Sequence, residues 1–261
     1  MPQTYRPLVL VAEEKLHKLH INYSELKIMY ILSPLSLVLL IPLLLSSCHS
    51  TPTTLNESDA PLNQLAEARD LHIVMVAYKA SQELELYYKS STDKSFTFYR
   101  TYPICRASGE LGPKRREGDR QVPEGFYHID RFNPNSAYHL SLGLDYPNAS
   151  DRILGHPTEP GSDIFIHGKC VTVGCLPMTD PIIEKLYSYA VAARDSGQER
   201  IPVYIFPFRM AEEEMRRHLQ AAENERHAAF WRDLKVGYDE WHLHREALTF
   251  SIDQAGRYRF E

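Results

Sequence analysis

Apolar and polar residues alternate in short segments through the middle of this 261-residue chain, a pattern typical of β-strands with one solvent-facing side. Turn-forming residues separate the segments, and 16 tyrosines and 10 phenylalanines favour a β-rich core. The predicted strands are residues 71–79, 83–89, 95–102, 125–130, 137–142, 163–167 and 201–208. Residues 89–94 are a predicted hairpin loop, and residues 108–124 a long loop rich in glycine and charge. Only residues 179–193 in this region have helical periodicity, so the pattern predicts a mainly β domain with peripheral helices and no βαβ alternation.

The last fifty residues have a different pattern. Residues 211–229 are highly charged and helical in composition, and a cluster of large apolar residues follows at 230–241. Residues 250–260 have the pattern of a small terminal hairpin. We therefore expect a helical C-terminal extension, residues 211–261, that packs against the main domain, with an interaction surface as the alternative. His242 and His244 form an H-x-H pair in this extension, which could bind a metal adventitiously.

The start of the chain contains an uncharged apolar run, residues 28–45, that ends in Leu45-Ser46-Ser47-Cys48. Its length would suit a short membrane span, but the small residues before Cys48 favour a processed export segment over residues 1–47. An uncleaved signal anchor is the alternative. The four residues at its end resemble the lipobox of bacterial lipoproteins, which implies that Cys48 is lipidated on the periplasmic side of a bacterial membrane. Residues 48–64 are polar and aperiodic, which predicts a tether before a domain over residues 65–210.

Charge and cysteine content narrow the function. The formal net charge of −5 argues against a nucleic-acid-binding protein. A lipidated Cys48 leaves three cysteines, and an odd number in an oxidising compartment allows one disulfide and one reactive thiol.

Residues 166–175, IHGKCVTVGC, carry the candidate chemistry. A thiol needs a base to become a thiolate at neutral pH, and His167 lies eight residues before Cys175. Gly174 would let the backbone approach a bound carbonyl, with the amide of Cys175 facing the developing oxyanion. Two alternatives remain open, namely buried structural cysteines and a zinc site of His167, Cys170 and Cys175. Zinc is disfavoured because the segment offers no fourth ligand at a suitable spacing.

Two motifs in order make the chain resemble a known family. His167-Gly168 precedes Thr172-Val173-Gly174-Cys175, and a Ser108-Gly109 loop precedes Val122-Pro-Glu-Gly-Phe-Tyr127. Together they resemble the YkuD-type L,D-transpeptidase catalytic domain, closest to its YafK-like branch, over roughly residues 70–208.

The resemblance implies a β-sandwich-like fold with a cleft against the sheet. It implies Cys175 as nucleophile, His167 as general base and the carbonyl of Gly168 as the group that orients the imidazole. It further implies peptidoglycan stem peptides as substrates, a thioester intermediate and no metal or cofactor. Cys175 would attack the carbonyl of an L-configured diamino acid and expel the D-residue beyond it, and an amine would then accept the acyl group.

The chain also departs from the family pattern. The gap between His167 and Cys175 is short, and Leu176-Pro177 follows the nucleophile where the family has an apolar residue and Arg. Other side chains would therefore contact the substrate. The candidates are Ser108, Lys114, Arg115, Arg116, Tyr138, Tyr146 and Thr172, with a solvated loop or core packing as the alternative readings. Arginines are suited to the carboxylates of stem peptides.

Three functions follow as hypotheses. The first is L,D-transpeptidation, the second is hydrolysis of the same bonds by a cysteine amidase or peptidase, and the third is a non-catalytic peptidoglycan-binding lipoprotein. If Cys48 is lipidated and Cys175 must remain a thiol, Cys105 and Cys170 are left to form a disulfide. Two buried free thiols are the alternative.

Overall fold

The structure, a computed structural model, describes residues 59–261, except for the side chains of residues 222–224. The predicted export segment and the lipidation site at Cys48 lie outside the described residues. Among residues 59–261, none of the helices combines the length and the apolar character needed to cross a bilayer.

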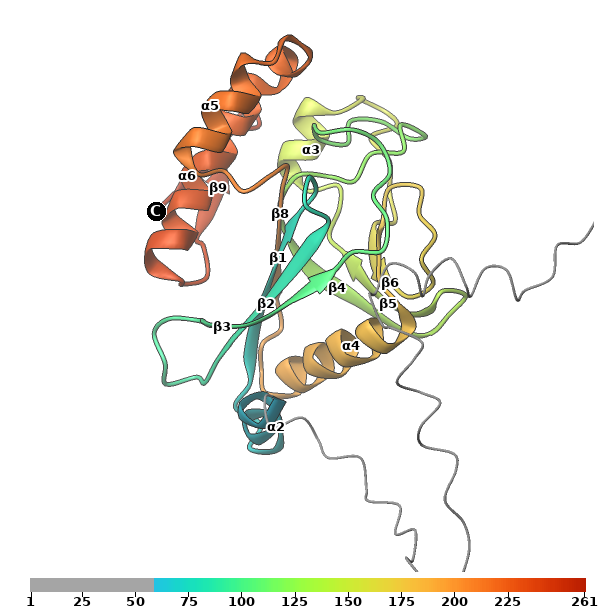
Figure 1. The fold of residues 1–261 in the computed structure, drawn as a ribbon, viewed down its shortest axis with the longest axis vertical. Helices are drawn as coiled ribbons and strands as arrows, with labels where there is room; N and C mark the ends of the chain where they lie inside the picture. The colour runs from blue at the N-terminus through green and yellow to red at the C-terminus, as the bar shows by residue number, and fades with distance from the viewer. Residues whose placement is uncertain (1–58) are drawn as a thin grey trace, which may run out of the picture. The chain divides into compact units, whose positions relative to one another are not determined.

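Eight strands form one curled mixed sheet in the order β3-β2-β1-β8-β4-β5-β6-β7 (Figure 1). The strands are β1 His72–Tyr78, β2 Glu83–Lys89, β3 Thr97–Pro103, β4 Gly125–Ser136, β5 His139–Leu144, β6 Phe165–His167, β7 Leu176–Pro177 and β8 Ile201–Phe206. The pairs β1–β8 and β6–β7 are parallel, and the other neighbours are antiparallel. The central strands β1 and β8 are buried along nearly their whole length, which explains their almost continuous apolar sequences.

Helix α4, Asp180–Asp195, covers one face of the sheet. Pro181 lies in its first turn, where a missing N–H costs nothing. Its buried residues Ile183, Leu186 and Ala190 share a core with strand residues such as Ile73 and Met75.

The C-terminal extension covers the opposite face, and Figure 1 shows α5 and α6 across the sheet from α4. It consists of α5 Glu212–Gln220, a 3-10 helix Ala222–His227, α6 Ala228–His244 and the hairpin β9 Phe250–Ile252 with β10 Tyr258–Phe260. Trp231 and Trp241 of α6 are fully buried against residues of β1 and β8 such as Val76 and Phe206. Truncating a buried tryptophan typically costs about 3–5 kcal/mol, so the extension is an integral part of the core.

The prediction of a mainly β fold with peripheral helices and a helical C-terminal extension is confirmed. Three elements differ from expectation. Helix α2, Ala60–Glu67, begins inside the predicted tether because Pro61 starts it and Leu62 is fully buried. Helix α3, Ala149–Leu154, begins with a capping box between Asn148 and Asp151, a short polar signal that apolar periodicity does not detect. Strand β7 is too short to show any alternation.

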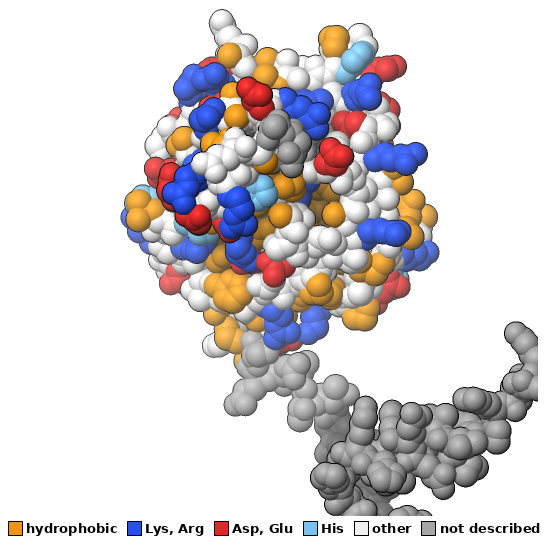
Figure 2. Space-filling model, turned by 45° about the horizontal axis from the view of Figure 1, so that its top comes forward, with side chains coloured by type: hydrophobic (Ala, Val, Ile, Leu, Met, Phe, Trp, Pro, Cys, Tyr) orange, Lys and Arg blue, Asp and Glu red, His pale blue; other side chains and the backbone are white. Residues whose placement is uncertain are grey.

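Acidic and basic side chains are interspersed over the face of the molecule shown in Figure 2, with apolar side chains exposed between them. No single sign of charge dominates that face. Such a surface generates little long-range steering of a highly charged polymer.

Candidate active site

The two candidate catalytic residues lie on neighbouring parallel segments, His167 in β6 and Cys175 directly before β7. His167 is paired with Pro177, and the amide of Met178 donates to the carbonyl of His167 at 2.7 Å. Cys175 directly precedes β7 and so lies beside the chain entering β6. Its Sγ is 3.7 Å from the carbonyl oxygen of Asp163, which accepts the thiol hydrogen bond. The loop between them, residues 168–175, is called the catalytic loop below.

The imidazole of His167 is held in one tautomer. Its Nδ1 lies 2.6 Å from the carbonyl oxygen of Gly168, which can only accept, so Nδ1 carries the proton. Nε2 is therefore the basic nitrogen of the neutral ring. The side chain is buried beneath Tyr138, with the ring centroids 4.7 Å apart, and burial lowers the pKa of His167 below its usual value. The ring is thus neutral and ready to accept a proton at neutral pH.

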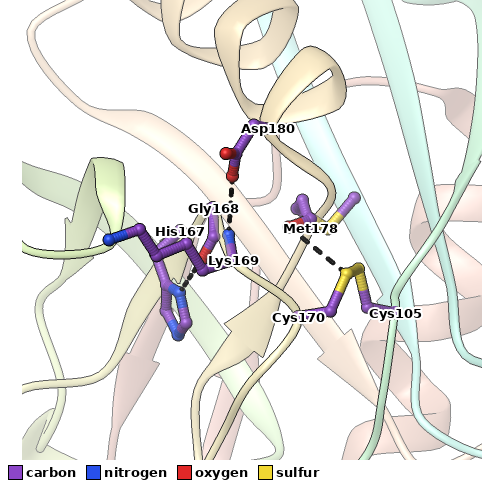
Figure 3. Close-up of a disulfide and its surroundings, with 7 residues drawn as sticks. All are labelled: Cys105, His167, Gly168, Lys169, Cys170, Met178 and Asp180. Atoms are coloured by element: carbon purple, nitrogen blue, oxygen red, sulfur yellow. Dashed lines mark hydrogen bonds between the residues drawn. A yellow bond between two sulfur atoms is a disulfide. The ribbon is translucent and has the colours of Figure 1, made fainter.

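Gly168 allows three backbone segments to meet behind the imidazole. A Cβ at this position would lie 2.7 Å from Oδ1 of Asp180 and 2.8 Å from the carbonyl oxygen of Tyr138. Asp180 is the first residue of α4, and its Oδ1 accepts from the amide of Lys169 at 2.8 Å (Figure 3). A carboxylate at a helix N-terminus is favourably placed, and here it also fixes the start of the catalytic loop.

The hydroxyl of Thr172 organises the turn before the nucleophile. It accepts from the amides of Gly174 at 3.2 Å and Cys175 at 2.8 Å, and it donates to the carbonyl of Cys175 at 2.8 Å. A hydroxyl has one donor and two acceptor lone pairs, and these three contacts use all of them. Thr172 therefore shapes the turn, and its hydroxyl has no hydrogen-bonding group left for substrate. The amide of Cys175, which the sequence predicts to face the oxyanion, donates to Thr172 in this structure, and its role toward substrate stays a prediction.

The thiol of Cys175 is partly buried, and this burial raises its pKa; the backbone of Phe165 and the charge of Lys114 act in the opposite direction. A raised thiol pKa beside a lowered imidazole pKa means that both groups rest uncharged. The arrangement therefore favours proton transfer to His167 during attack over a preformed thiolate–imidazolium pair.

A disulfide between Cys105 and Cys170 anchors the middle of the catalytic loop (Figure 3). The S–S distance is 2.08 Å, and the amide of Cys105 donates to the carbonyl of Pro177 at 2.8 Å. Residue 105 is thereby tied to both sides of Cys175. The zinc alternative fails in this structure, because the bonded sulfur of Cys170 is not available as a thiolate ligand.

A small pocket opens beside the thiol. Its lining residues are Ala77, Lys79, Gln82, Ile104, Arg106, Ala107, Val122, Cys175 and Leu176. Most of this lining is apolar, and two of its members, Lys79 and Arg106, are cationic.

The predicted basic cluster is largely occupied by internal partners. Lys114 is buried, and its Nζ donates to Asp119 at 2.7 Å. Arg115 contacts Asp151 at 3.4 Å and stacks over the ring of Phe230 at 4.6 Å. Both side chains are therefore engaged within the protein, and their contact with substrate stays a prediction. Arg116 is exposed and remains a candidate.

The other predicted contacts divide in the same way. Tyr138 is 47% exposed and its ring contacts the imidazole of His167, so it lies at the candidate site. Tyr146 is buried, and its hydroxyl donates to the carbonyl of Pro160 at 2.7 Å, so it belongs to the core and is removed from the substrate contacts. The hydroxyl of Ser108 is buried without a hydrogen-bond partner among residues 59–261.

Sequence reasoning missed Arg106, Lys79 and Asp180. Arg106 directly follows a cysteine of the expected disulfide, and that adjacency was the one available signal. Lys79 and Asp180 have no local signal of a role at the site.

The two motifs, carried on a curled mixed sheet, indicate the class of protein: an L,D-transpeptidase catalytic domain. The model of this family, YkuD, matches residues 72–205, and the chain belongs to the family.

Among individual relatives, the chain is 37% identical over 183 residues to "Putative L,D-transpeptidase YafK" of Escherichia coli (strain K12), covering 69% of this chain and 70% of that protein. Among solved structures, the helical cell shape determining protein Pgp2 of Campylobacter jejuni is 16% identical with a TM-score of 0.42, covering 75% and 80% of the two chains.

Proposed function

We propose that this protein is an exported cysteine acyltransferase that acts on peptidoglycan stem peptides. The observation that carries the proposal is the Nδ1 hydrogen bond of His167 to Gly168, which leaves Nε2 as the basic nitrogen on β6, while Cys175 directly precedes the neighbouring strand β7. Membership of a peptidoglycan-related family supports the substrate class. The Cys105–Cys170 disulfide supports a location outside the cytoplasm.

In the first half-reaction, Nε2 of His167 takes the thiol proton as Sγ of Cys175 attacks the peptide carbonyl. The tetrahedral intermediate then collapses, the C–N bond breaks, and the departing amine of the D-residue takes the proton from His167. A thioester on Cys175 remains. In the second half-reaction an acceptor loses a proton to Nε2 and attacks the thioester, and the thiol recovers that proton.

The nature of the acceptor decides between transfer and hydrolysis. Leu176 and Pro177 are buried in β7, so no cation follows the nucleophile directly, and Lys114 and Arg115 are engaged in the fold. An acceptor side with few fixed charges holds an amine acceptor weakly and lets water compete. We therefore propose hydrolysis as a second outcome. It should account for a larger fraction of turnover here than in relatives that have an apolar residue and Arg after the nucleophile.

Purified sacculi and a defined donor peptide test the proposal together. With the peptide alone and with excess D-amino acid, mass analysis separates hydrolysed product from exchanged product. Cys175→Ala removes the nucleophile and should abolish both products, and His167→Ala should lose most activity, because a thiol with a pKa above 8.5 is only a few per cent thiolate at neutral pH. Unchanged sacculi and peptide with the wild-type protein would favour the non-catalytic binding alternative.

The proposal includes anchoring through a lipid on Cys48, which rests on Leu45-Ser46-Ser47-Cys48 alone. A single acyl chain binds a membrane only marginally, so stable anchoring requires more than one chain. The intact mass of the protein extracted from membranes tests this. An unlipidated mass that still includes residues 1–47 would disprove it.

A further inference from the structure

We propose that Arg106 binds the α-carboxylate of the D-residue that leaves the donor peptide, and so selects donors with a free C-terminus. The assignment rests on the proposed function. It makes Arg106 a specificity-determining residue of the same site.

The position of Arg106 is fixed relative to the nucleophile. The preceding residue, Cys105, is bonded through sulfur to Cys170, on one side of Cys175 in the sequence, and through its amide to Pro177, on the other side. Arg106 itself lines the pocket that contains Cys175. Its backbone cannot move away from the thiol without breaking a covalent bond and a hydrogen bond.

Arg106 is also free to bind an anion. Its side chain is exposed, and no acidic residue among residues 59–261 pairs with it. Acidic groups near the site have other partners: Asp163 contacts Arg131 at 2.8 Å, and Glu124 contacts Lys79 at 2.9 Å. Lys79, the other cation of the pocket lining, is buried and neutralised by that contact. Of the two cationic residues in the lining, Arg106 is therefore the one without an acidic partner among residues 59–261.

The chemistry of the donor supplies a matching group. When Cys175 attacks the carbonyl before the terminal residue, the free carboxylate lies only one residue beyond the reacting carbon. The Cα atoms of these two consecutive residues are about 3.8 Å apart. A guanidinium binds a carboxylate with two parallel hydrogen bonds and fixes its orientation, which a lysine cannot do equally well. Binding the terminal carboxylate would therefore also place the scissile carbonyl over the thiol.

The test pairs each enzyme variant with two donors in the full-length chain. One donor is a tetrapeptide stem with a free terminal carboxylate, and the other is the same peptide with a C-terminal amide. Arg106→Ala should lower kcat/KM about 10- to 100-fold for the carboxylate donor, as expected for the loss of a charged hydrogen-bonded pair, and less than about threefold for the amide. Arg106→Lys should recover part of the loss. Arg232→Ala, an exposed arginine of α6, is the matched control and should change neither donor.

The outcomes separate the two levels of inference. Equal losses on both donors would show a general effect on the site, and no loss on the carboxylate donor would show that Arg106 does not bind it; either result overturns the assignment alone. If the wild-type protein converts neither donor and forms no acyl adduct on Cys175, the proposed function is wrong and the assignment fails with it. Equal melting temperatures of the variants establish that all of them fold.

Discussion

Two loops form the walls around Cys175, and different kinds of interaction hold them. The catalytic loop, residues 168–175, is held mainly by neighbours in sequence or by covalent chemistry: the hydroxyl of Thr172, the carboxylate of Asp180 and the disulfide at Cys170. The long loop, residues 107–124, is held mainly by a buried polar cluster that reaches the C-terminal extension.

Glu124 is the centre of that cluster. It is fully buried and accepts hydrogen bonds from Nζ of Lys79 at 2.9 Å, from the amide of Gly112 at 2.7 Å and from Nε1 of Trp231 at 2.8 Å. Lys79 donates in addition to the carbonyls of Gly112 and Val122. A buried charge pair offsets its desolvation only with such complete hydrogen bonding, so every member of the cluster depends on the others.

The two loops meet at Gly174. Its φ of +121° and the 3.0 Å between a hypothetical Cβ and the carbonyl oxygen of Gln121 leave room for glycine alone. The turn that carries the nucleophile is therefore set against a loop whose position depends on Trp231. The comparison shows that the C-terminal extension supports the site through a chain of contacts although it lies on the far face of the sheet.

The largest effect should come from the buried cluster. Glu124→Ala leaves the Lys79 ammonium buried without its partner, which should lower the free energy of unfolding by about 3–5 kcal/mol in urea titrations. Glu199→Ala, at an exposed position, is the control and should change stability by less than about 0.5 kcal/mol. A loss below about 1 kcal/mol for Glu124→Ala would mean that the long loop does not depend on this cluster.

Removing the disulfide should have the next largest effect. The double variant Cys105→Ser, Cys170→Ser frees a loop with a sequence separation of 65, and the expected loss of unfolding free energy is about 2–4 kcal/mol. Dithiothreitol added to the wild-type protein should reproduce this loss, and the double variant should no longer respond to it. Equal stability with and without reductant would show that hydrogen bonds alone hold the catalytic loop.

A smaller effect is expected from the turn itself. Thr172→Ala removes the acceptor for the amides of Gly174 and Cys175, which should cost about 0.5–1.5 kcal/mol of stability. If the same amount is lost from the alignment of the thiol, thioester formation slows roughly tenfold. Thr172→Ser keeps the hydroxyl and should restore the rate. A serine variant as slow as the alanine variant would assign the effect to the lost methyl group.

The smallest perturbation is a change of pH. Burial lowers the pKa of His167 below the ordinary value of about 6.5, so the imidazole should still be mostly neutral at that pH. The rate of thioester formation should therefore fall only at pH values lower than about 6.5. Because burial raises the pKa of Cys175, no second transition is expected across neutral pH. Stopped-flow measurement of acyl-enzyme formation between pH 4 and 9 tests this, with His167→Ala as the variant without the acid transition. A midpoint above pH 7 would contradict the neutral pair.

The fold class and the two candidate catalytic residues follow from local patterns in the chain. The apolar runs of β1 and β8, the alternation in β2 and the periodicity of α4 are local properties, so they are visible without coordinates. His167 and Cys175 lie in one short segment, and the order of the two family motifs favoured catalysis over structural cysteines or a zinc site there. The Cys105–Cys170 pairing could be predicted from the number of cysteines, because only these two remain if Cys48 is lipidated and Cys175 is a free thiol.

Which polar groups remain free for chemistry depends instead on contacts between residues far apart in the chain. Lys114 and Arg115 are paired inside the fold, Arg106 is not, and nothing in their local sequence separates these cases. The pairing of Glu124 with Trp231 joins residues 107 positions apart. The orientation of the Cys175 amide likewise depends on the turn that Thr172 closes. Local patterns determine where a chain forms strands and helices, whereas the availability of a charge or an amide depends on which distant group the folded topology places beside it.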